Sequence, residues 1–183
     1  MKKYVLFVSV IVVATWLCAC NSDDDVNDFE EINPNAIQPI NLTDGDIVDF
    51  FNSELPERHT GNDPEKMSIP FLMDDYYHNN EVHVINSRQE LADLYVGEKE
   101  LPAIDFDKYT LIIGQQIMPG LGYYIRKRKL VMEEDGLVLT LNARNDGEAI
   151  ALALQHLYFW GLYPKLPQDR ITVNVIEELP KFH

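Results

Sequence analysis

The only two cysteines of this 183-residue chain stand at positions 18 and 20, directly behind an apolar N-terminal segment. Lys2 and Lys3 precede that segment, and residues 4–16 are too few for a membrane-spanning helix, which needs about 20 apolar residues. A short positive start followed by such a run is typical of an export signal. The chain beyond position 20 contains no thiol, so disulfides, cysteine nucleophiles and thiolate metal sites are excluded from it.

Leu17, Ala19 and Cys20 resemble the lipobox of bacterial lipoproteins, with an aliphatic residue three positions before the cysteine and a small residue directly before it. The resemblance implies that residues 1–19 are a signal peptide and that Cys20 becomes the lipidated first residue. Cys18 fits less well because bulky Leu17 precedes it. A secretory signal with an incidental cysteine is the alternative. We therefore expect contact with a membrane through a lipid on Cys20.

An acidic segment follows directly after Cys20. Ser22 and the aspartates at 23–25 resemble the export signal by which some Gram-negative bacteria place lipoproteins on the outer face of the outer membrane. A like-charged polar run cannot bury enough surface to fold, so residues 20–39 are also expected to be a solvated tether. We expect a lipid-anchored protein of the outer membrane that faces the cell exterior, with a single α+β domain over residues 40–183.

The charge of the chain restricts its partners. It has 30 acidic and 15 basic residues and a net charge of −15, which becomes −17 when Lys2 and Lys3 leave with the signal peptide. Nucleic acid is held chiefly by Lys and Arg contacts to phosphate, so it is not expected as a partner. Adhesion to anionic lipid through charge is equally disfavoured. A cationic partner remains compatible with this composition.

The local patterns predict mostly strands. Ser87 and Glu90 form a capping box, which predicts a helix over 88–96. Strands are predicted at 82–85, 109–116, 122–132, 137–142, 149–159 and 171–176, although a helix is an alternative for 149–159. Asp-Gly pairs at 135–136 and 146–147 predict two hairpins, residues 161–167 a loop, and residues 46–51 a short strand or helical turn. The expected fold is α+β, mostly an antiparallel meander or sandwich with one main helix closing the core.

Several short motifs occur in a fixed order between residues 83 and 178. They are Asn86-Ser87 and Leu91 in the predicted helix, Leu101-Pro102-Ala103-Ile104-Asp105-Phe106 before a strand, Gly114, Pro119-Gly120-Leu121-Gly122-Tyr123-Tyr124-Ile125, and Tyr163-Pro164. This order resembles the C-terminal domain of the protease complex subunit PrcB family, from which Leu121 departs where the family tends to have a second small residue. The resemblance implies a β-rich, non-catalytic accessory module whose partner is a surface protease that it stabilises.

Two aromatic segments are the expected protein-binding surface. The first contains Pro119, Gly120, Gly122, Tyr123 and Tyr124, and the second contains Tyr158, Trp160 and Tyr163. Aromatic side chains dominate binding hot spots, and they dominate cores as well. A Pro-Gly loop on a β scaffold could also plug a cleft, so a protease inhibitor is an alternative. The basic run at 126–129 either protects a sheet edge or docks an acidic partner, with Arg126 and Arg128 expected on one face.

A metal-dependent enzyme is the other alternative. Asp75, His78, Glu81 and His83 are candidate ligands, and a strand would point Glu81 and His83 to one face because they are two positions apart. Zinc sites usually show tighter paired spacing, so an exposed polar loop is the competing interpretation. No serine lies in a Gly-x-Ser-x-Gly motif. The sequence therefore predicts a protein that is not an enzyme, needs no cofactor and binds another protein.

The lipid anchor can be tested by removing its thiol. A serine hydroxyl cannot accept the lipid through a thioether, so we expect Cys20→Ser to stay an uncleaved precursor or to become soluble, whereas Cys18→Ser should be processed almost normally. Immunoblots of membrane and soluble fractions measure both variants. A Cys20→Ser protein that is cleaved and still partitions with the outer membrane would contradict the lipoprotein hypothesis.

Overall fold

The computed structural model describes residues 33–43, 45–59, 69–73, 80–145, 154–167 and 170–178. These residues belong to the compact unit Ile32–His183. The predicted signal peptide, Cys20, most of the acidic tether, and the candidate ligands Asp75 and His78 lie outside the described residues. No helix within the described ranges is long and apolar enough to cross a membrane.

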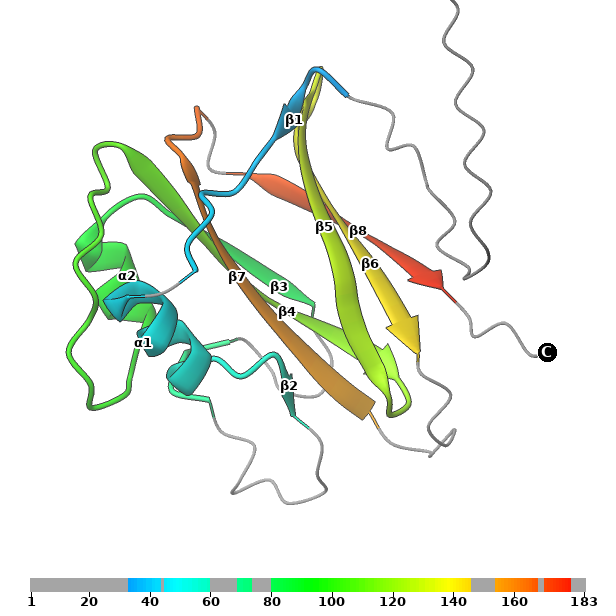
Figure 1. The fold of residues 1–183 in the computed structure, drawn as a ribbon, viewed down its shortest axis with the longest axis horizontal. Helices are drawn as coiled ribbons and strands as arrows, with labels where there is room; N and C mark the ends of the chain where they lie inside the picture. Colours follow the sequence, from blue (N-terminus) through cyan, green and yellow to red (C-terminus); the bar gives the residue numbers. More distant parts are fainter. Residues whose placement is uncertain are drawn as a thin grey trace, which may run out of the picture. The chain divides into compact units, whose positions relative to one another are not determined.

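The described strands form two four-stranded sheets (Figure 1). The strand order is β1-β5-β6-β8 in one sheet and β2-β7-β4-β3 in the other. This β-rich architecture with helices confirms the coarse α+β fold class that the sequence predicts. In chain order the elements are β1 (Ala36–Ile37), α1 (Asp46–Glu54), β2 (Arg58–His59), β3 (Glu81–Ile85), α2 (Arg88–Leu94), β4 (Tyr109–Pro119), β5 (Tyr123–Glu133), β6 (Gly136–Asn145), β7 (Leu154–Pro164) and β8 (Ile171–Glu178).

The strand connections depart from the predicted meander. β5 and β6 form the expected hairpin, in which Glu133 faces Gly136. β4, however, pairs with β7, and β8 runs parallel to β6. The hairpin predicted at Asp146-Gly147 is therefore wrong, because β6 and β7 belong to different sheets. Turn residues indicate where a chain can reverse, and they carry no information about the strand that it meets afterwards.

Three element boundaries also differ from the prediction. β7 continues through the predicted loop at 161–167 as far as Pro164, which faces Tyr109 at the start of β4. α2 ends at Leu94, two residues early. Residues 46–54 form the helix α1, which buries Phe50 and Phe51 and gives the described part a second helix. Pairing with a long neighbour thus extends a strand over glycine and proline, which by themselves predict a loop.

The predicted capping box begins α2 as expected. The Ser87 side-chain oxygen accepts from the Glu90 backbone N–H at 3.1 Å. Glu90 Oε2 accepts in turn from the backbone N–H of Asn86 at 2.6 Å, one residue before the cap. One backbone donor that a helix start leaves without a partner, the Glu90 N–H, is therefore satisfied, and so is the Asn86 N–H just before the cap, which fixes where α2 begins.

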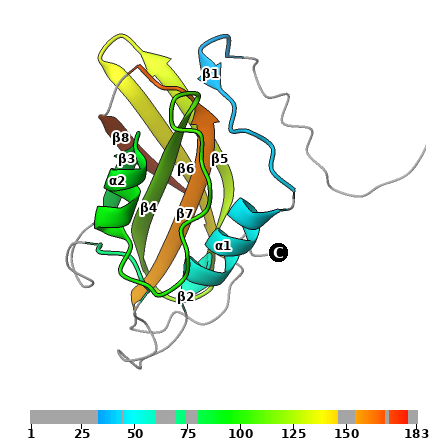
Figure 2. The ribbon, with the colours of Figure 1, turned by 90° about the vertical axis from the view of Figure 1, so that its left-hand side faces the viewer.

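The β4 and β7 strands lie between two apolar layers. Side chains on one face, which include Leu111, Ile113 and Tyr158, pack with Phe51 of α1 and Leu91 of α2. Figure 2 shows both helices in front of these strands and β5 and β6 behind them. This order explains why almost every residue of β4 is buried: its sheet is covered on both faces.

The other face of β4 and β7 packs against the second sheet. Ile112, Phe159 and Tyr163 meet an alternating series of leucines on β6, which are Leu137, Leu139 and Leu141. The series has the period of two that a half-buried strand requires. The two sheets are therefore joined mainly by apolar burial.

Gly114 of β4 provides a test of this packing. A Cβ at Gly114 would overlap the ring of Phe159 and lie 2.8 Å from the backbone oxygen of Glu81 on β3. We expect Gly114→Ala to lower the free energy of unfolding by about 1–3 kcal/mol, as overpacking does elsewhere. Urea unfolding measures it. In a double-mutant cycle Phe159→Leu should remove part of this loss, and strictly additive effects would contradict the proposed clash.

Candidate functional site

A groove of about 470 Å³ opens between α1, β5 and β7. It lies where the two sheets meet at one side of the molecule, so that each sheet supplies one wall. Most of the lining residues are apolar, while Asn52, Glu57 and Arg128 add polar groups, so the exposed wall is about as polar as it is apolar. The full lining is Leu42, Val48, Asn52, Leu55, Pro56, Glu57, Ile125, Arg128, Tyr158, Phe159 and Trp160.

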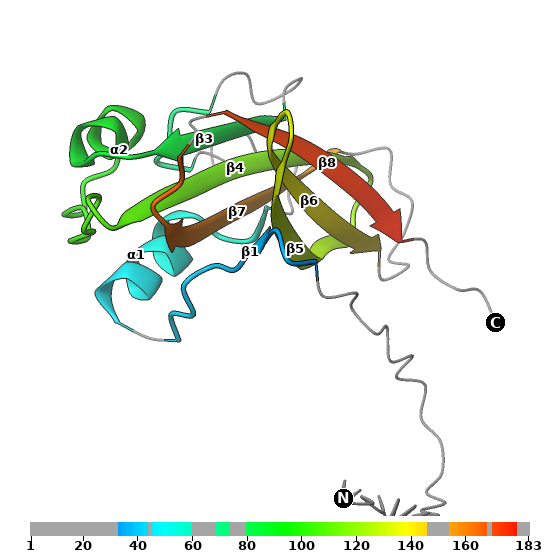
Figure 3. The ribbon, with the colours of Figure 1, turned by 90° about the horizontal axis from the view of Figure 1, so that it is seen from above.

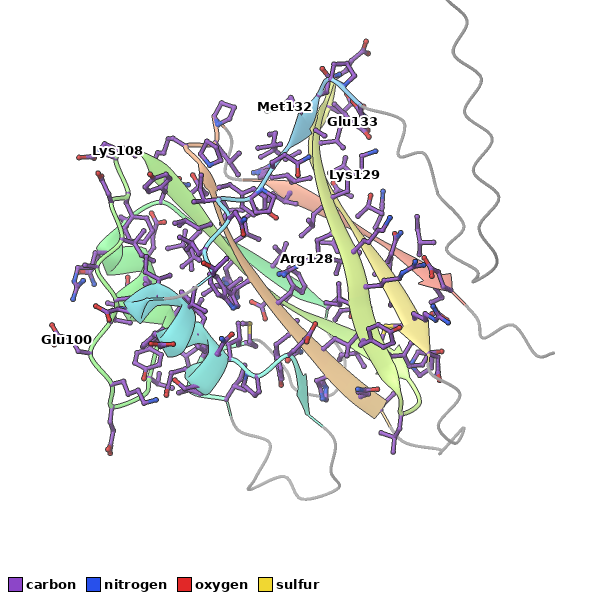
Figure 4. The ribbon with its side chains drawn as sticks, in the orientation of Figure 1. Glu100, Lys108, Arg128, Lys129, Met132 and Glu133 are labelled. Carbon is purple, nitrogen blue, oxygen red and sulfur yellow. The ribbon has the colours of Figure 1, made fainter. Side chains whose placement is uncertain are left out.

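Arg128 bridges the two sheets inside this groove. Its Nη1 donates a hydrogen bond to the backbone carbonyl oxygen of Trp160. Figure 4 shows the Arg128 side chain directed from β5 toward β7. Among the described residues, no carboxylate forms an ion pair with it. The guanidinium is therefore held in position by a neutral acceptor, and it shares the groove with Glu57 without a described ion pair.

Trp160 is held by α1 on the helix side of β7. Its ring stacks on that of Phe51, with 4.5 Å between the ring centroids and 24° between the planes. The side chain is half-buried and also lines the groove. An indole fixed on one face by a buried ring is a rigid apolar wall for whatever enters.

The basic run at 126–129 does not place both arginines on one face. A register shift between Ile125 and Lys127 inserts Arg126 as an extra residue in β5. Arg126 Nη1 then lies 3.1 Å from Glu178 Oε2 on β8, in the same sheet, whereas Arg128 reaches β7 in the other sheet. The expected common face is wrong because a bulge changes the phase of the alternation.

The structure brings only part of the predicted binding surface together. Tyr158 and Trp160 line the groove, with Tyr158 almost fully buried. Tyr163 lies between the sheets, where burial raises the pKa of its hydroxyl and the charge of Arg128 lowers that pKa by a smaller amount. Its side chain therefore belongs to the core.

The turn between β4 and β5 is a separate feature from the groove. Pro119 is exposed, while Gly120, Gly122 and Tyr123 are buried and Tyr124 is half-buried. The buried side chain of Gln155 fixes this turn, because it accepts from the Tyr123 N–H at 2.8 Å and donates to the Tyr123 carbonyl at 2.9 Å. Gly120 and Gly122 have φ of 132° and 89°, which explains why glycine stands at both positions. Of these five residues, none lines the groove.

The candidate metal ligands are only partly described. Nε2 of His83 lies 2.7 Å from Oε1 of Glu81, so the two side chains share one face of β3 as their spacing predicts. Asp75 and His78 fall outside the described residues. Within the described ranges, no three His, Cys, Asp or Glu side chains are placed to hold a metal ion.

A second cavity, of about 490 Å³, lies at the opposite meeting of the sheets, between β3 and β8. Figure 3 shows these two strands next to each other. Glu133, Asp135 and Arg170 are among its lining residues. It contains none of the residues that the sequence singled out for binding or catalysis.

A polar cluster fixes the helix that forms one wall of the groove. Glu54, at the end of α1, accepts from the Tyr95 hydroxyl at 2.9 Å and lies 2.7 Å from Lys99 Nζ. The hydrogen bond from Lys99 is the main cause that lowers the pKa of Glu54, while burial acts in the opposite direction. Burial, followed by the hydrogen bond to Glu54, raises the pKa of Tyr95. The cluster ties α1 to the chain after α2, a long-range contact that no local motif predicts.

No protein-family model, curated protein or solved structure matches this chain. The resemblance to the PrcB family therefore rests on the motifs given above.

The lowered pKa of Glu54 predicts an acid-dependent loss of stability. A carboxyl group with a lowered folded-state pKa stabilises the fold above its ordinary pKa of about 4.3, and this contribution disappears as the pH falls through the lowered value. We expect thermal unfolding of the unaltered protein to show this loss below about pH 4.3. Glu54→Gln should show a smaller loss over the same range. Glu100→Gln, at an exposed position nearby, is the control and should behave like the unaltered protein.

Proposed function

We propose that this chain is a lipid-anchored, non-catalytic accessory protein of the bacterial outer membrane, facing the cell exterior, that binds another protein of the envelope. The positive start, the apolar run and the lipobox-like sequence ending at Cys20 support the anchor. The acidic run that begins at Ser22 supports the exterior location.

The groove carries the binding part of the proposal. Arg128 presents a fixed cation with no described carboxylate partner, and Trp160 presents a fixed aromatic wall beside it. Arginine and tryptophan are the residue types most enriched at the energetic centres of protein interfaces. A groove with fixed aromatic and aliphatic walls and two charged groups, Arg128 and Glu57, suits recognition, because little conformational entropy is lost when a partner binds.

The kind of partner follows from the family resemblance. The motifs from Asn86 to Pro164 resemble those of a module that stabilises a surface protease, so we propose a protease or another envelope complex as the binding partner. In this role the chain itself performs no chemistry, and its effect is on the stability or activity of the protein that it binds.

Photo-cross-linking in intact cells tests this proposal. A photoreactive amino acid at Asn52, which is exposed and lines the groove, should give one defined protein adduct. The same amino acid at Asn174, exposed on β8 and absent from the groove lining, is the matched control and should not give that adduct. Equal adduct patterns at both positions, or none at Asn52, would contradict a partner at the groove.

A further inference from the structure

Arg128 places a cation in the groove of a chain with twice as many acidic as basic residues. Within the described part, Lys99 pairs with Glu54, Lys108 with Asp105 and Arg126 with Glu178. Arg88, Lys165 and Arg128 instead donate to backbone carbonyls, and of these three only Arg128 lines the groove. A guanidinium has five N–H donors in a planar fork, so most of them are left to bind a carboxylate from outside.

The groove around Arg128 has the size and polarity of a small binding site. Its volume of about 470 Å³ falls within the 300–1,000 Å³ typical of ligand pockets. Val48 of α1 and Leu55, the residue after α1, form one wall, and Ile125 of β5 forms another. An apolar side chain can therefore be buried beside a carboxylate that Arg128 holds.

The edge of β5 beside the groove is open to an extended chain. β1 pairs with β5 only at Leu130 and Val131, and no other described strand lies on that side of β5. From Ile125 to Arg128 this edge spans about 10 Å, the length of three extended residues. A peptide strand can add to an edge of this kind through its backbone.

The same edge is closed just beyond Arg128. Residues 38–42 leave β1 and cross to the other sheet (Figure 1). There the Ile40 N–H donates to the Leu162 carbonyl at 2.7 Å. A chain that follows β5 from Ile125 meets this crossing segment, so its pairing with β5 ends there. Arg128 would repel a terminal ammonium group and attract a terminal carboxylate.

The geometry points to a binding site for the C-terminus of a polypeptide, in which Arg128 holds the terminal carboxylate and the groove takes an apolar last side chain. This inference rests on the proposed function and specifies the part of the partner that the groove receives. The bound segment would run parallel to β5, with its end at the crossing segment 38–42.

Tryptophan fluorescence can test the site directly. The chain has two tryptophans, so in the full chain with Trp16→Phe, kept in detergent, all emission comes from Trp160 in the groove. The probes are acetyl-Ala-Ala-Leu with a free C-terminus, its C-terminal amide, and acetyl-Asp-Ala-Leu amide, which moves the carboxylate to a side chain. We expect the free acid to change the emission with saturation and both amides to bind about 10- to 100-fold more weakly.

Arg128→Gln should weaken binding of the free acid by a similar factor, and Arg128→Lys should restore part of it, because lysine keeps the charge but not the planar fork. Lys129→Gln, the next position on β5, is the matched control and should bind normally. If Arg128→Gln does not fold, the comparison of the free acid with its amide on the protein that retains Arg128 still shows whether a terminal carboxylate is recognised.

Equal affinity for acid and amide, or no saturable change with any peptide, overturns the inference. Tighter binding of acetyl-Asp-Ala-Leu amide than of the free acid also overturns it, because a side-chain carboxylate is then preferred to a terminal one. A cross-link that persists at Asn52 in such a case would mean that a partner binds the groove without inserting its C-terminus. Loss of that cross-link as well would contradict the proposed function itself.

Discussion

The pairing of β4 with β7 is the interaction on which the rest of the described structure depends. It runs from Tyr109 opposite Pro164 to Pro119 opposite Leu154 and joins two distant parts of the chain. Each face of the pair is apolar, so each must be covered. The helices cover one face, and the β5–β6 hairpin with β8 covers the other. Closing so long a loop costs entropy, which the burial on both faces must offset.

The groove is a consequence of how the outer edge of β7 is completed. β2 pairs with β7 only at His156 and Leu157. Further along the same edge, the Ile40 N–H donates to the Leu162 carbonyl. Between them no described strand supplies a donor to the Trp160 carbonyl. The Arg128 side chain supplies one from the other sheet. One side chain thus completes the edge of β7 and leaves a cation in an apolar groove.

Local patterns predicted the elements better than their partners. The capping box at Ser87 placed α2, and alternation placed β5, β6 and β8, because these signals act within a few residues. Strand order was missed, since it depends on which apolar faces meet after the chain turns. The aromatic segment around Trp160 indicated that this residue belongs to a binding surface, and Trp160 does line the groove. The role of Arg128 depends on a bulge at Arg126 and on β7 lying opposite, and neither follows from spacing.

The net charge and the groove act over different distances. A chain with a net charge of −15 repels an anionic partner at long range, but at physiological ionic strength this repulsion is screened beyond about 8 Å. A carboxylate in contact with Arg128 lies well inside that distance, so salt screens its attraction to the guanidinium much less. The acidic surface therefore slows the approach of acidic chains in general, while the groove favours one that can place its carboxylate and an apolar side chain together. Selectivity arises from this combination, because neither group alone satisfies both the fixed cation and the apolar walls.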